Sequence, residues 1–402
     1  MIQKRKVFYI EGYDPQGAAG YYALFRREFE RFRKLWPLRG TLTPLAAEPG
    51  AHAAHWSIES EAPNWKVTTA YEFLNWDDII ARDLARNMAW RLARAAVWFA
   101  DDLWSGTTAR IFRASWRFAL FYIYPLVMLL LWLALALAAG WIAARLAAAS
   151  LAPPIVALIG IAVALAAYWL LRPLAERRLA IQLADLWFFF RDLSFGRRAD
   201  FAARIDRFAE RLVAAAAAAD ADEIVVVGHS GGAVVAALVV GRALAIDPRL
   251  GKRGPRLVLL TLGSIMPAVA MHPRAQDLRD VLRRLALEPD LLWIDCQART
   301  DFVNFHKFDP IAGVGIDAGP AAPNPVVRSI RFRDLLAPET YQRFRYNVFR
   351  MHFQFIMAND RRAAYDYFLY LCGPIALELW ARDPAQALAS FGADASVSRA
   401  HQ

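Results

Sequence analysis

The chain is 402 residues long, carries a formal net charge of +10 and is 57% hydrophobic, which is more than a soluble domain usually contains. That length allows one large α/β domain with an insertion, and two cysteines are too few for a disulfide framework, which fits a reducing compartment. The sequence contains no zinc-ligand spacing, Walker loop or RNA-binding aromatic motif. We therefore expect no metal, no other cofactor and no nucleic-acid partner.

The chain begins with short segments that have strand and helix patterns. We expect a strand over Lys6–Ile10, a loop over residues 11–17 and a helix over Tyr21–Leu35, where apolar residues recur at helical spacing. His55–Glu59 and Lys66–Phe73 have the pattern of two further strands.

A basic, aromatic helical stretch follows over Asp77–Trp104. It contains Trp90, Trp98 and Trp104, and tryptophan is enriched where a membrane meets water, so a helix lying against lipid headgroups is one interpretation. An ordinary amphipathic helix packed on the sheet is the other. The sequence does not separate the two.

Two long uncharged segments come next. No Asp, Glu, Lys or Arg occurs from Phe118 to Ala144 or from Leu146 to Leu171, and about 20 helical residues suffice to cross a hydrocarbon core of about 30 Å. The proline pair at 153–154 interrupts the helical register between them. We expect a hairpin of two transmembrane helices at about residues 118–144 and 151–171. A buried hairpin is disfavoured because core helices rarely run ~25 residues without a charge.

The arginines that flank this hairpin predict its orientation. Arg110, Arg113 and Arg117 precede the first segment, Arg172, Arg177 and Arg178 follow the second, and Arg145 lies near the turn. Because positive charge concentrates on the cytoplasmic side, we expect an integral protein of the inner or cytoplasmic membrane whose soluble domain faces the cytoplasm. The lipid bilayer is then an expected partner, and the positive charge favours anionic headgroups.

The second half of the chain alternates helices with strands. The predicted helices are Leu174–Phe190, Ala199–Ala219, Gln276–Leu287 and Arg361–Leu371, and the predicted strands are Glu223–Val227, Arg256–Leu262, Leu291–Asp295 and Val326–Phe332. Such alternation is typical of a mostly parallel sheet. We expect a discontinuous α/β domain of residues 1–82 and 195–402, interrupted by a helical membrane insertion of residues 83–194. These patterns do not determine an oligomeric state.

The most informative stretch is Ile-Val-Val-Val-Gly-His-Ser-Gly-Gly at residues 224–232. An apolar β-branched run leads directly into Gly-x-Ser-x-Gly, and a helix-like run follows, which is the setting of a nucleophile elbow. Gly228 and Gly232 leave room for the chain to fold back, so that Ser230 is held in a strained conformation with its hydroxyl accessible. A plain strand-to-helix turn is the alternative interpretation.

This order of motifs resembles the α/β-hydrolase superfamily over about residues 1–80 and 195–402. The resemblance rests on the turn Gly228–Gly232, on the glycine loop after the first strand, and on an aspartate and a histidine that follow the serine in the chain. It implies a mostly parallel sheet with helices on both faces and a serine hydrolase of the esterase or lipase type. It does not imply a substrate, because this fold supports many chemistries.

The resemblance places the catalytic base in the loop after the last strand. His229 lies inside the turn and is expected to point elsewhere, and His401 lies in the terminal tail. His52 and His55 precede the serine, and His272 precedes the strand that should carry the acid. Of the remaining candidates, His306 and His352, only His352 lies beyond Val326–Phe332, so His352 is the expected base. A histidine packed among aromatic neighbours is the ordinary interpretation of the same residue.

Three aspartates follow the strand Leu291–Asp295 and are candidates for the acid: Asp301, Asp309 and Asp317. Asp309 begins an Asp-Pro turn that resembles the acid turn of many lipases, and it is the expected acid. Asp301 lies closer to the strand and is the alternative acid. Both could instead cap turns. Asp301 and Asn304 could also hold the loop that presents Asp309.

The oxyanion hole of such an enzyme needs two backbone N–H donors. By the resemblance, Gly231 supplies one and Tyr13, the residue after Gly12, supplies the other. Glu11 stands where many family members have histidine.

Together these residues predict a membrane-anchored serine hydrolase that cleaves a lipid or other acyl ester through an acyl-enzyme on Ser230. An acyltransferase or a thioesterase could use the same triad, and so could a peptidase. A catalytically inactive scaffold of hydrolase fold is the alternative from another class.

Overall fold

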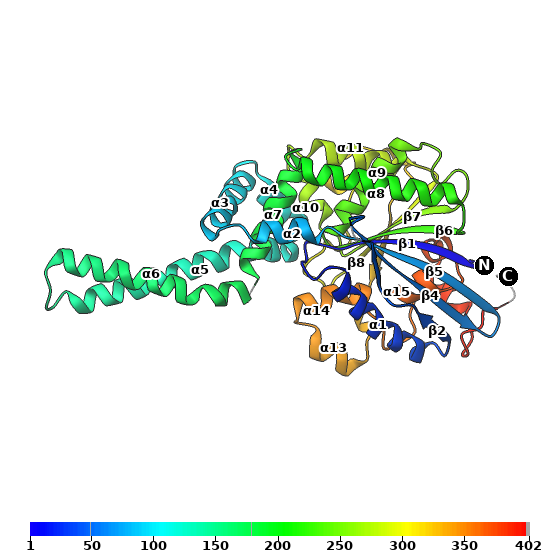
Figure 1. Cartoon of the computed structure of the whole chain (residues 1–402), viewed down its shortest axis with the longest axis horizontal. Coiled ribbons are helices and arrows are strands. Elements are labelled where there is room, and N and C mark those ends of the chain that lie inside the picture. Colours follow the sequence, from blue (N-terminus) through cyan, green and yellow to red (C-terminus); the bar gives the residue numbers. More distant parts are fainter. Residues whose placement is uncertain (49, 178, 399–402) are drawn as a thin grey trace.

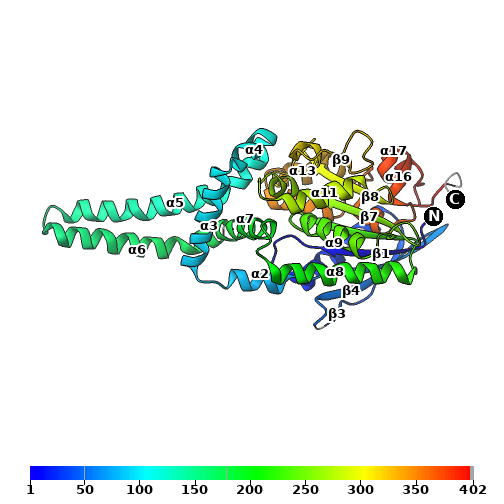
Figure 2. The ribbon, with the colours of Figure 1, turned by 90° about the horizontal axis from the view of Figure 1, so that it is seen from above.

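In the described part of the chain, a nine-stranded sheet forms the centre of the molecule and helices cover both of its faces (Figure 1). A helical hairpin projects from one end (Figure 2). The structure is a computed structural model that describes residues 1–48, 50–177 and 179–398, without the side chain at 175. Arg178 and His401, which enter the predictions above, lie outside the described residues.

The sheet is mostly parallel. Its strands are β1 Lys4–Ile10, β2 Arg39–Leu42, β3 Ala46–Glu48, β4 Ala53–Ala62, β5 Trp65–Leu74, β6 Glu223–His229, β7 Arg256–Leu262, β8 Leu291–Ala298 and β9 Val326–Ile330. Their order is β2-β4-β5-β1-β6-β7-β8-β9, with β3 paired to β4. The six strands β5, β1, β6, β7, β8 and β9 run parallel to one another. At the other edge, β2, β3 and β4 form antiparallel pairs. This bears out the expected mostly parallel α/β sheet.

Helices on the two faces of the sheet build two hydrophobic cores. The helices of the sheet domain are α1 Gly17–Leu35, α8 Ala199–Ala218, α9 Gly232–Ile246, α10 Met266–Ala270, α11 Gln276–Leu287, α12 Phe332–Leu335, α13 Pro338–Phe344, α14 Val348–His352, α15 Tyr367–Cys372, α16 Leu377–Arg382 and α17 Pro384–Ala389. Alternate residues of β6 point to opposite cores: Ile224 and Val226 pack with α8, α9 and α11, and Val225 and Val227 pack on the side of α1 and α15. Because β6 is buried on both faces, its residues 224–227 form a continuous apolar run.

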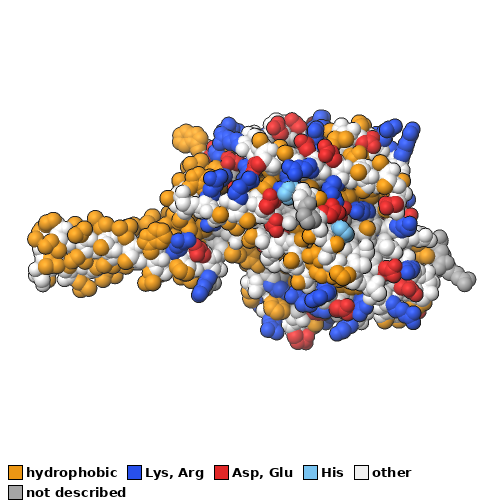
Figure 3. Space-filling view, viewed as in Figure 1, with side chains coloured by type: hydrophobic (Ala, Val, Ile, Leu, Met, Phe, Trp, Pro, Cys, Tyr) orange, Lys and Arg blue, Asp and Glu red, His pale blue; other side chains and the backbone are white. Residues whose placement is uncertain are grey.

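Six further helices lie between β5 and α8: α2 Asp77–Leu84, α3 Met88–Trp104, α4 Thr107–Ala114, α5 Trp116–Ala147, α6 Pro153–Arg177 and α7 Ala180–Ser194. The apolar hairpin is formed by α5 and α6, and Trp116–Ala147 and Pro153–Leu174 are each long and apolar enough to cross a membrane. Hydrophobic side chains cover its outer part on the face shown in Figure 3.

The base of the insertion belongs to the core of the α/β domain. Phe118 and Tyr122 of α5 and Trp187 and Phe189 of α7 are buried in the same cluster as α8 and α9. Phe118 stacks on Phe305, with 4.3 Å between ring centroids. The segment 83–194 is therefore packed against the sheet domain through its base, and the hairpin beyond that base stands free.

Three predicted helices are divided or shortened in the structure. The stretch Asp77–Trp104 is two helices, because Asn87 caps α3 by accepting a hydrogen bond from Trp90 N–H at 2.8 Å. The stretch Leu174–Phe190 is interrupted at Leu179, whose φ is +57°. Of Arg361–Leu371, only the end from Tyr367 is helical, because Asp366 caps α15 there.

The expected strand Val326–Phe332 ends at Ile330, and Phe332 begins α12. The short strands β2 and β3 were not predicted from the sequence. Both lie at the antiparallel edge and are mostly exposed, so neither has the apolar alternation that marks a half-buried strand.

Candidate active site

Ser230 lies in the turn between β6 and α9 with a φ of +59°. Such a conformation costs on the order of 1–3 kcal/mol in a residue with a side chain, and it persists only where the surroundings impose it. Two backbone hydrogen bonds do so here: Ser230 N–H donates to Leu262 O at 2.9 Å, and Ala233 N–H donates to Ser230 O at 3.2 Å. The Gly-x-Ser-x-Gly segment therefore has the strained geometry that its sequence predicts.

The two flanking glycines are required by close backbone contacts. A Cβ at Gly228 would lie 2.5 Å from Ala233 Cα, and a Cβ at Gly232 would lie 2.2 Å from Ile10 O. Both distances are far shorter than a carbon atom allows. The strand can therefore turn directly into α9 beside β1 only because these positions lack side chains.

His352, at the end of α14, is hydrogen-bonded to Asp301. Its Nδ1 lies 2.8 Å from Asp301 Oδ2, and both residues are buried, at 3% and 1% exposure. Because a carboxylate accepts hydrogen bonds, Nδ1 carries the ring proton and Nε2 carries the lone pair. Among the described residues Nε2 has no hydrogen-bond partner, so it is the ring nitrogen free to act as a base.

The loop after β8 is organised to present Asp301. Asn304 accepts a hydrogen bond from Ala298 N–H at 3.1 Å and donates to the carbonyls of Ala298 and Asp301 at 3.0 Å each. The second carboxylate oxygen of Asp301 accepts from Val303 N–H at 2.8 Å. These bonds leave Asp301 Oδ2 facing the histidine.

The prediction that Asp309 pairs with His352 is wrong. Asp309 is exposed, and its Oδ1 accepts hydrogen bonds from Ile311 and Ala312 N–H at 2.7 and 3.1 Å, which is the turn-capping role that Asp before Pro commonly has. Asp317 caps a turn in the same way, through Gly319 N–H at 2.9 Å. The alternative acid, Asp301, is the aspartate that contacts the histidine.

His229 does not point away from the site, as its place in the turn suggested. Its ring stacks on that of His352 with 4.5 Å between centroids, and its Nε2 donates to His352 O at 3.2 Å. Burial, and then the neighbouring His352, lower the pKa of His229 well below its usual value, so the ring stays neutral. His306 lies elsewhere, 2.8 Å from Ser329 Oγ.

Gly263, directly after β7, lies close to His352. It has a φ of +55°, and a Cβ there would lie 2.9 Å from His352 Cε1. Both the backbone conformation and the space therefore require glycine. No sequence motif marks this position, because the contact joins residues 89 positions apart.

Ser230 and His352 line one cavity of about 340 Å³. No hydrogen bond joins Ser230 Oγ to His352 Nε2 among the described residues. Apolar side chains from the insertion form part of the wall: Phe121 of α5, Leu179 before α7, and Leu183 and Leu186 of α7. Sequence reasoning did not place the insertion at the site.

The predicted oxyanion residues lie beside the serine. A Cβ at Gly12 would lie 3.3 Å from Ser230 Cβ and 3.5 Å from Gly231 N, so the first loop passes directly over the turn. Among the described residues, neither Tyr13 N–H nor Gly231 N–H donates a hydrogen bond. Two free amides at this place are suited to a developing oxyanion.

Glu11, the residue before Gly12 in the first loop, is fully buried, and neither carboxylate oxygen has a hydrogen-bond partner among the described residues. Burial raises its pKa well above the usual value, with Asp14 and Asp77 adding to the effect. Burial therefore favours the protonated, neutral form of Glu11. Its carbonyl accepts a hydrogen bond from Trp76 Nε1 at 3.2 Å, which holds the loop.

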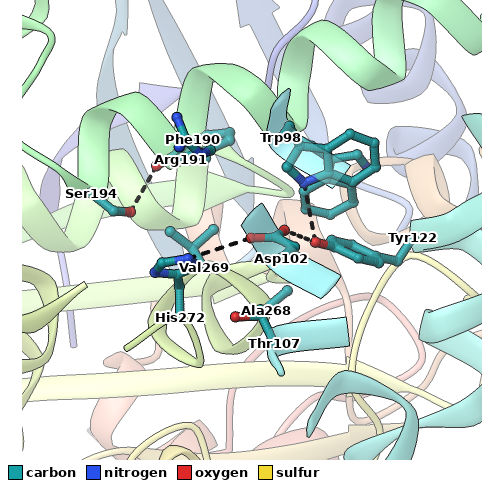
Figure 4. A pocket seen from close by; sticks show the side chains of 11 residues that line it. Trp98, Asp102, Thr107, Tyr122, Phe190, Arg191, Ser194, Ala268, Val269 and His272 are labelled. Carbon is teal, nitrogen blue, oxygen red and sulfur yellow. Dashed lines mark hydrogen bonds and ion pairs between the residues drawn. The ribbon is translucent and has the colours of Figure 1, made fainter. Parts of the chain in front are cut away.

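A second, smaller cavity of about 20 Å³ is lined in part by Asp102 and His272 (Figure 4). With Asp101, these two residues form the one potential metal-ligand cluster found among the described residues. His272 Nδ1 accepts a hydrogen bond from Arg274 N–H at 3.1 Å, so in the neutral ring Nε2 carries the proton and offers no lone pair. Burial lowers the pKa of His272 to about 4 and keeps the ring neutral.

The carboxylates of this cluster already have partners. Asp101 is paired with Arg191 at 2.7 Å. Asp102 accepts a hydrogen bond from Tyr122, which in turn accepts one from Trp98 (Figure 4). The cavity holds about one water molecule. The cluster is a polar contact between α3, α7 and the sheet domain and does not fit a metal.

Compared with known proteins, the chain matches no family model, no curated protein and no solved structure. Its function must therefore be inferred from its own residues and their geometry.

Proposed function

We propose that the chain is a membrane-anchored serine hydrolase that cleaves a carboxylic ester through an acyl-enzyme on Ser230. One observation carries the proposal: a serine at a φ of +59° between strand and helix shares a cavity with a histidine whose Nδ1 lies 2.8 Å from a buried aspartate. A nucleophile, a base and an orienting acid are the three parts that serine catalysis requires.

In the proposed reaction, Ser230 Oγ attacks the ester carbonyl while His352 Nε2 takes the hydroxyl proton. Asp301 holds the imidazole in the required tautomer and stabilises its positive charge. The N–H groups of Tyr13 and Gly231 stabilise the oxyanion. The protonated histidine gives its proton to the leaving alcohol, and water, activated by the same histidine, then hydrolyses the acyl-enzyme.

The arrangement along the chain supports an α/β-hydrolase-like fold. The serine follows a central strand, β6, whose neighbour β1 leads into the loop that passes over the serine. The acid follows β8, and the histidine follows β9. Ligands of open α/β sheets bind at the carboxyl ends of the strands, where these three residues meet.

The apolar hairpin supports a membrane anchor, and the cavity wall supports a substrate that comes from the membrane. Phe121, Leu183 and Leu186 join the base of the hairpin to the space beside Ser230. Fatty acyl chains suit such a wall. The substrate class is therefore a lipid ester or another acyl ester held at the bilayer, with the hydrolase domain on the cytoplasmic side, where the flanking arginines place it.

Labelling with a fluorophosphonate probe tests the nucleophile. The purified protein in detergent should be labelled, and S230A should not be. S329A is the matched control, since Ser329 is exposed and lies in β9, and it should be labelled as the wild type is. Equal labelling of S230A and the wild type would refute the assignment.

Substrate class is tested by comparing hydrolysis of short soluble esters with that of phospholipids and acylglycerols in vesicles. We expect higher kcat/KM for vesicle substrates. A preference for short esters that vesicles or micelles do not change would refute a membrane substrate. Protease added to right-side-out vesicles should leave the hydrolase domain intact, and its digestion would refute the cytoplasmic orientation.

A further inference from the structure

Helix α3 has an exposed face that is entirely apolar. The residues exposed within the helix are Ala89, Ala93, Ala96, Val97, Ala100, Leu103 and Trp104. At 3.6 residues per turn they fall within about 120° of the helix circumference. Trp104 is 95% exposed, Leu103 60% and Val97 51%. A surface helix of a soluble protein normally has charged and polar residues on this side.

The charged residues of α3 point the other way, into the protein. Arg91 is paired with Asp185 of α7 at 2.5 Å, and Arg94 is paired with Asp192 of α7 at 3.0 Å. Asp101 of α3 is paired with Arg191 of α7 at 2.7 Å.

These ion pairs and the packed side chains beside them hold α3 in one rotation about its axis. Trp98 is 1% exposed, and the other charged residue of the helix, Asp102, is 5% exposed. The apolar face therefore cannot turn inward without breaking three ion pairs.

The position of α3 places this face beside the hairpin. Figures 1 and 2 show α3 at the base of the hairpin, and in Figure 2 it runs across the hairpin axis. Met88 and Leu92 of α3 and Leu171 of α6 pack against a small cluster formed by Trp132 of α5 and Ile181 of α7. A helix that runs across two spanning helices lies along the membrane plane.

The length of the hairpin beyond this contact indicates how deep α3 lies. The segments 133–147 and 153–167 extend past Trp132 and its stacking partner Tyr168, and fifteen residues each span about 22 Å at 1.5 Å per residue. A hydrocarbon core is about 30 Å thick. The hairpin reaches across only if its base, with α3, enters the bilayer by several ångströms.

We infer that α3 is an interfacial helix, with its exposed face buried at the boundary between headgroups and acyl chains of the bilayer that the hairpin crosses. The inference rests on the proposed membrane anchor. The depth required by the hairpin matches the roughly 5–10 Å at which interfacial helices lie. Trp90, with Arg86 and Arg94 over its ring at 5.1 and 4.1 Å, has the composition of an interfacial anchor.

Such a helix constrains the rest of the molecule. A hairpin alone lets the attached domain rotate and tilt about the membrane normal, whereas a second contact in the membrane plane restricts the tilt. Because α3 is joined to α7 by the ion pairs above, and α7 lines the cavity, α3 holds the Ser230 cavity at a set height over the bilayer.

Depth-dependent quenching tests the inference. Single cysteines are introduced by V97C and L103C, labelled with the fluorophore NBD, and the full-length protein is placed in nanodiscs of phosphatidylcholine and phosphatidylglycerol. The native cysteines, Cys296 and Cys372, are buried and are not labelled in the folded protein. Lipids carry a nitroxide either near the headgroup end or near the methyl end of the acyl chain.

Two control positions make the outcomes distinct. L137C lies in the middle of the outer hairpin, and A217C is exposed near the end of α8 that is far from the hairpin. We expect NBD at residues 97 and 103 to show blue-shifted emission and the larger loss of intensity with the headgroup-end nitroxide. NBD at residue 137 should lose more intensity with the methyl-end nitroxide, and NBD at residue 217 should lose none with either.

Quenching at residue 137 with none at residues 97 and 103 would overturn the interfacial position of α3 and leave the anchor standing. Blue-shifted emission at residues 97 and 103 without quenching would also overturn it, because a protein surface would then cover the face. Absence of quenching at residue 137 would overturn the membrane anchor itself.

Discussion

His352 Nδ1 lies 2.8 Å from Asp301 Oδ2, the ring of His229 stacks on the imidazole, and the backbone of Gly263 lies close to its Cε1. Nδ1 is held by this hydrogen bond, and Nε2 has no hydrogen-bond partner among the described residues. The residues that immobilise this histidine come from β6, β7 and the loop after β8, which meet only in the folded protein.

Substituting each aspartate in turn should show whether Asp301 or Asp309 acts as the acid. D301N removes the negative charge and allows the wrong histidine tautomer, so ester hydrolysis should fall on the order of 10⁴-fold in kcat, as in other triads. D309N is the matched control and should remain close to wild type, because Asp309 caps an exposed turn. Steady-state kinetics with a chromogenic ester measure both, and a larger loss in D309N would contradict the assignment.

His229 should act as a positioning residue for His352. H229F keeps a stacked ring but removes the donor to His352 O, which at about 1 kcal/mol per hydrogen bond corresponds to roughly a fivefold loss in kcat. H229Q can restore the donor and should recover part of the loss. KM should change little in both. Equal kcat in H229F and the wild type, or a loss confined to KM, would refute this role.

The contact between Gly263 and His352 can be tested by comparing Gly263 with Gly315, a second glycine that has a positive φ. G263A should lose activity, because its Cβ would displace His352 as well as straining the backbone by about 1–2 kcal/mol. G315A is the control: Gly315 has a φ of +81°, but a Cβ there meets no atom within 4 Å. Both variants should show similar losses of thermal stability from the backbone, and only G263A should lose fluorophosphonate labelling. Normal labelling of G263A would contradict the proposed contact.

Asp295 should make stability depend on pH. Burial raises its pKa from 3.8 to about 6, although Thr261 and Gln297 donate hydrogen bonds to the carboxylate at 2.5 and 2.8 Å. The folded protein therefore holds this proton more tightly than the unfolded chain. The contribution of Asp295 to the free energy of unfolding is complete below pH 3.8. It is lost as the pH rises through 6, by on the order of 2–3 kcal/mol.

D295N removes this titration. The apparent melting temperature of the wild type relative to that of D295N should therefore fall as the pH is raised from 4 to 7. Thermal unfolding in detergent across this range measures the difference, and taking it between the two proteins cancels the other titrating groups. A constant difference, or one that increases with pH, would show that Asp295 is ionised throughout in the folded state.

Much of the α/β framework could be predicted from the sequence, because its strands are covered on both faces. Arg256–Leu262 was predicted with the bounds that the structure has, and Glu223–Val227 was short by two residues. Exposed edge strands such as β2 could not be found, since nothing in an exposed strand forces apolar alternation. Helix boundaries near Asn87 and Asp366 were missed because a single capping side chain decides each of them.

The amino-acid sequence by itself determined the serine turn at residues 228–232 and the apolar hairpin. Both depend on contiguous residues: small side chains beside one serine, and long runs without charge. Tertiary structure alone decided which aspartate meets His352, because residues 299–325 form a long connection in which local hydrogen bonds turn Asp301 inward and Asp309 outward. It also decided that α3 turns its charges inward, since those charges are satisfied by α7, about 90 residues further along the chain.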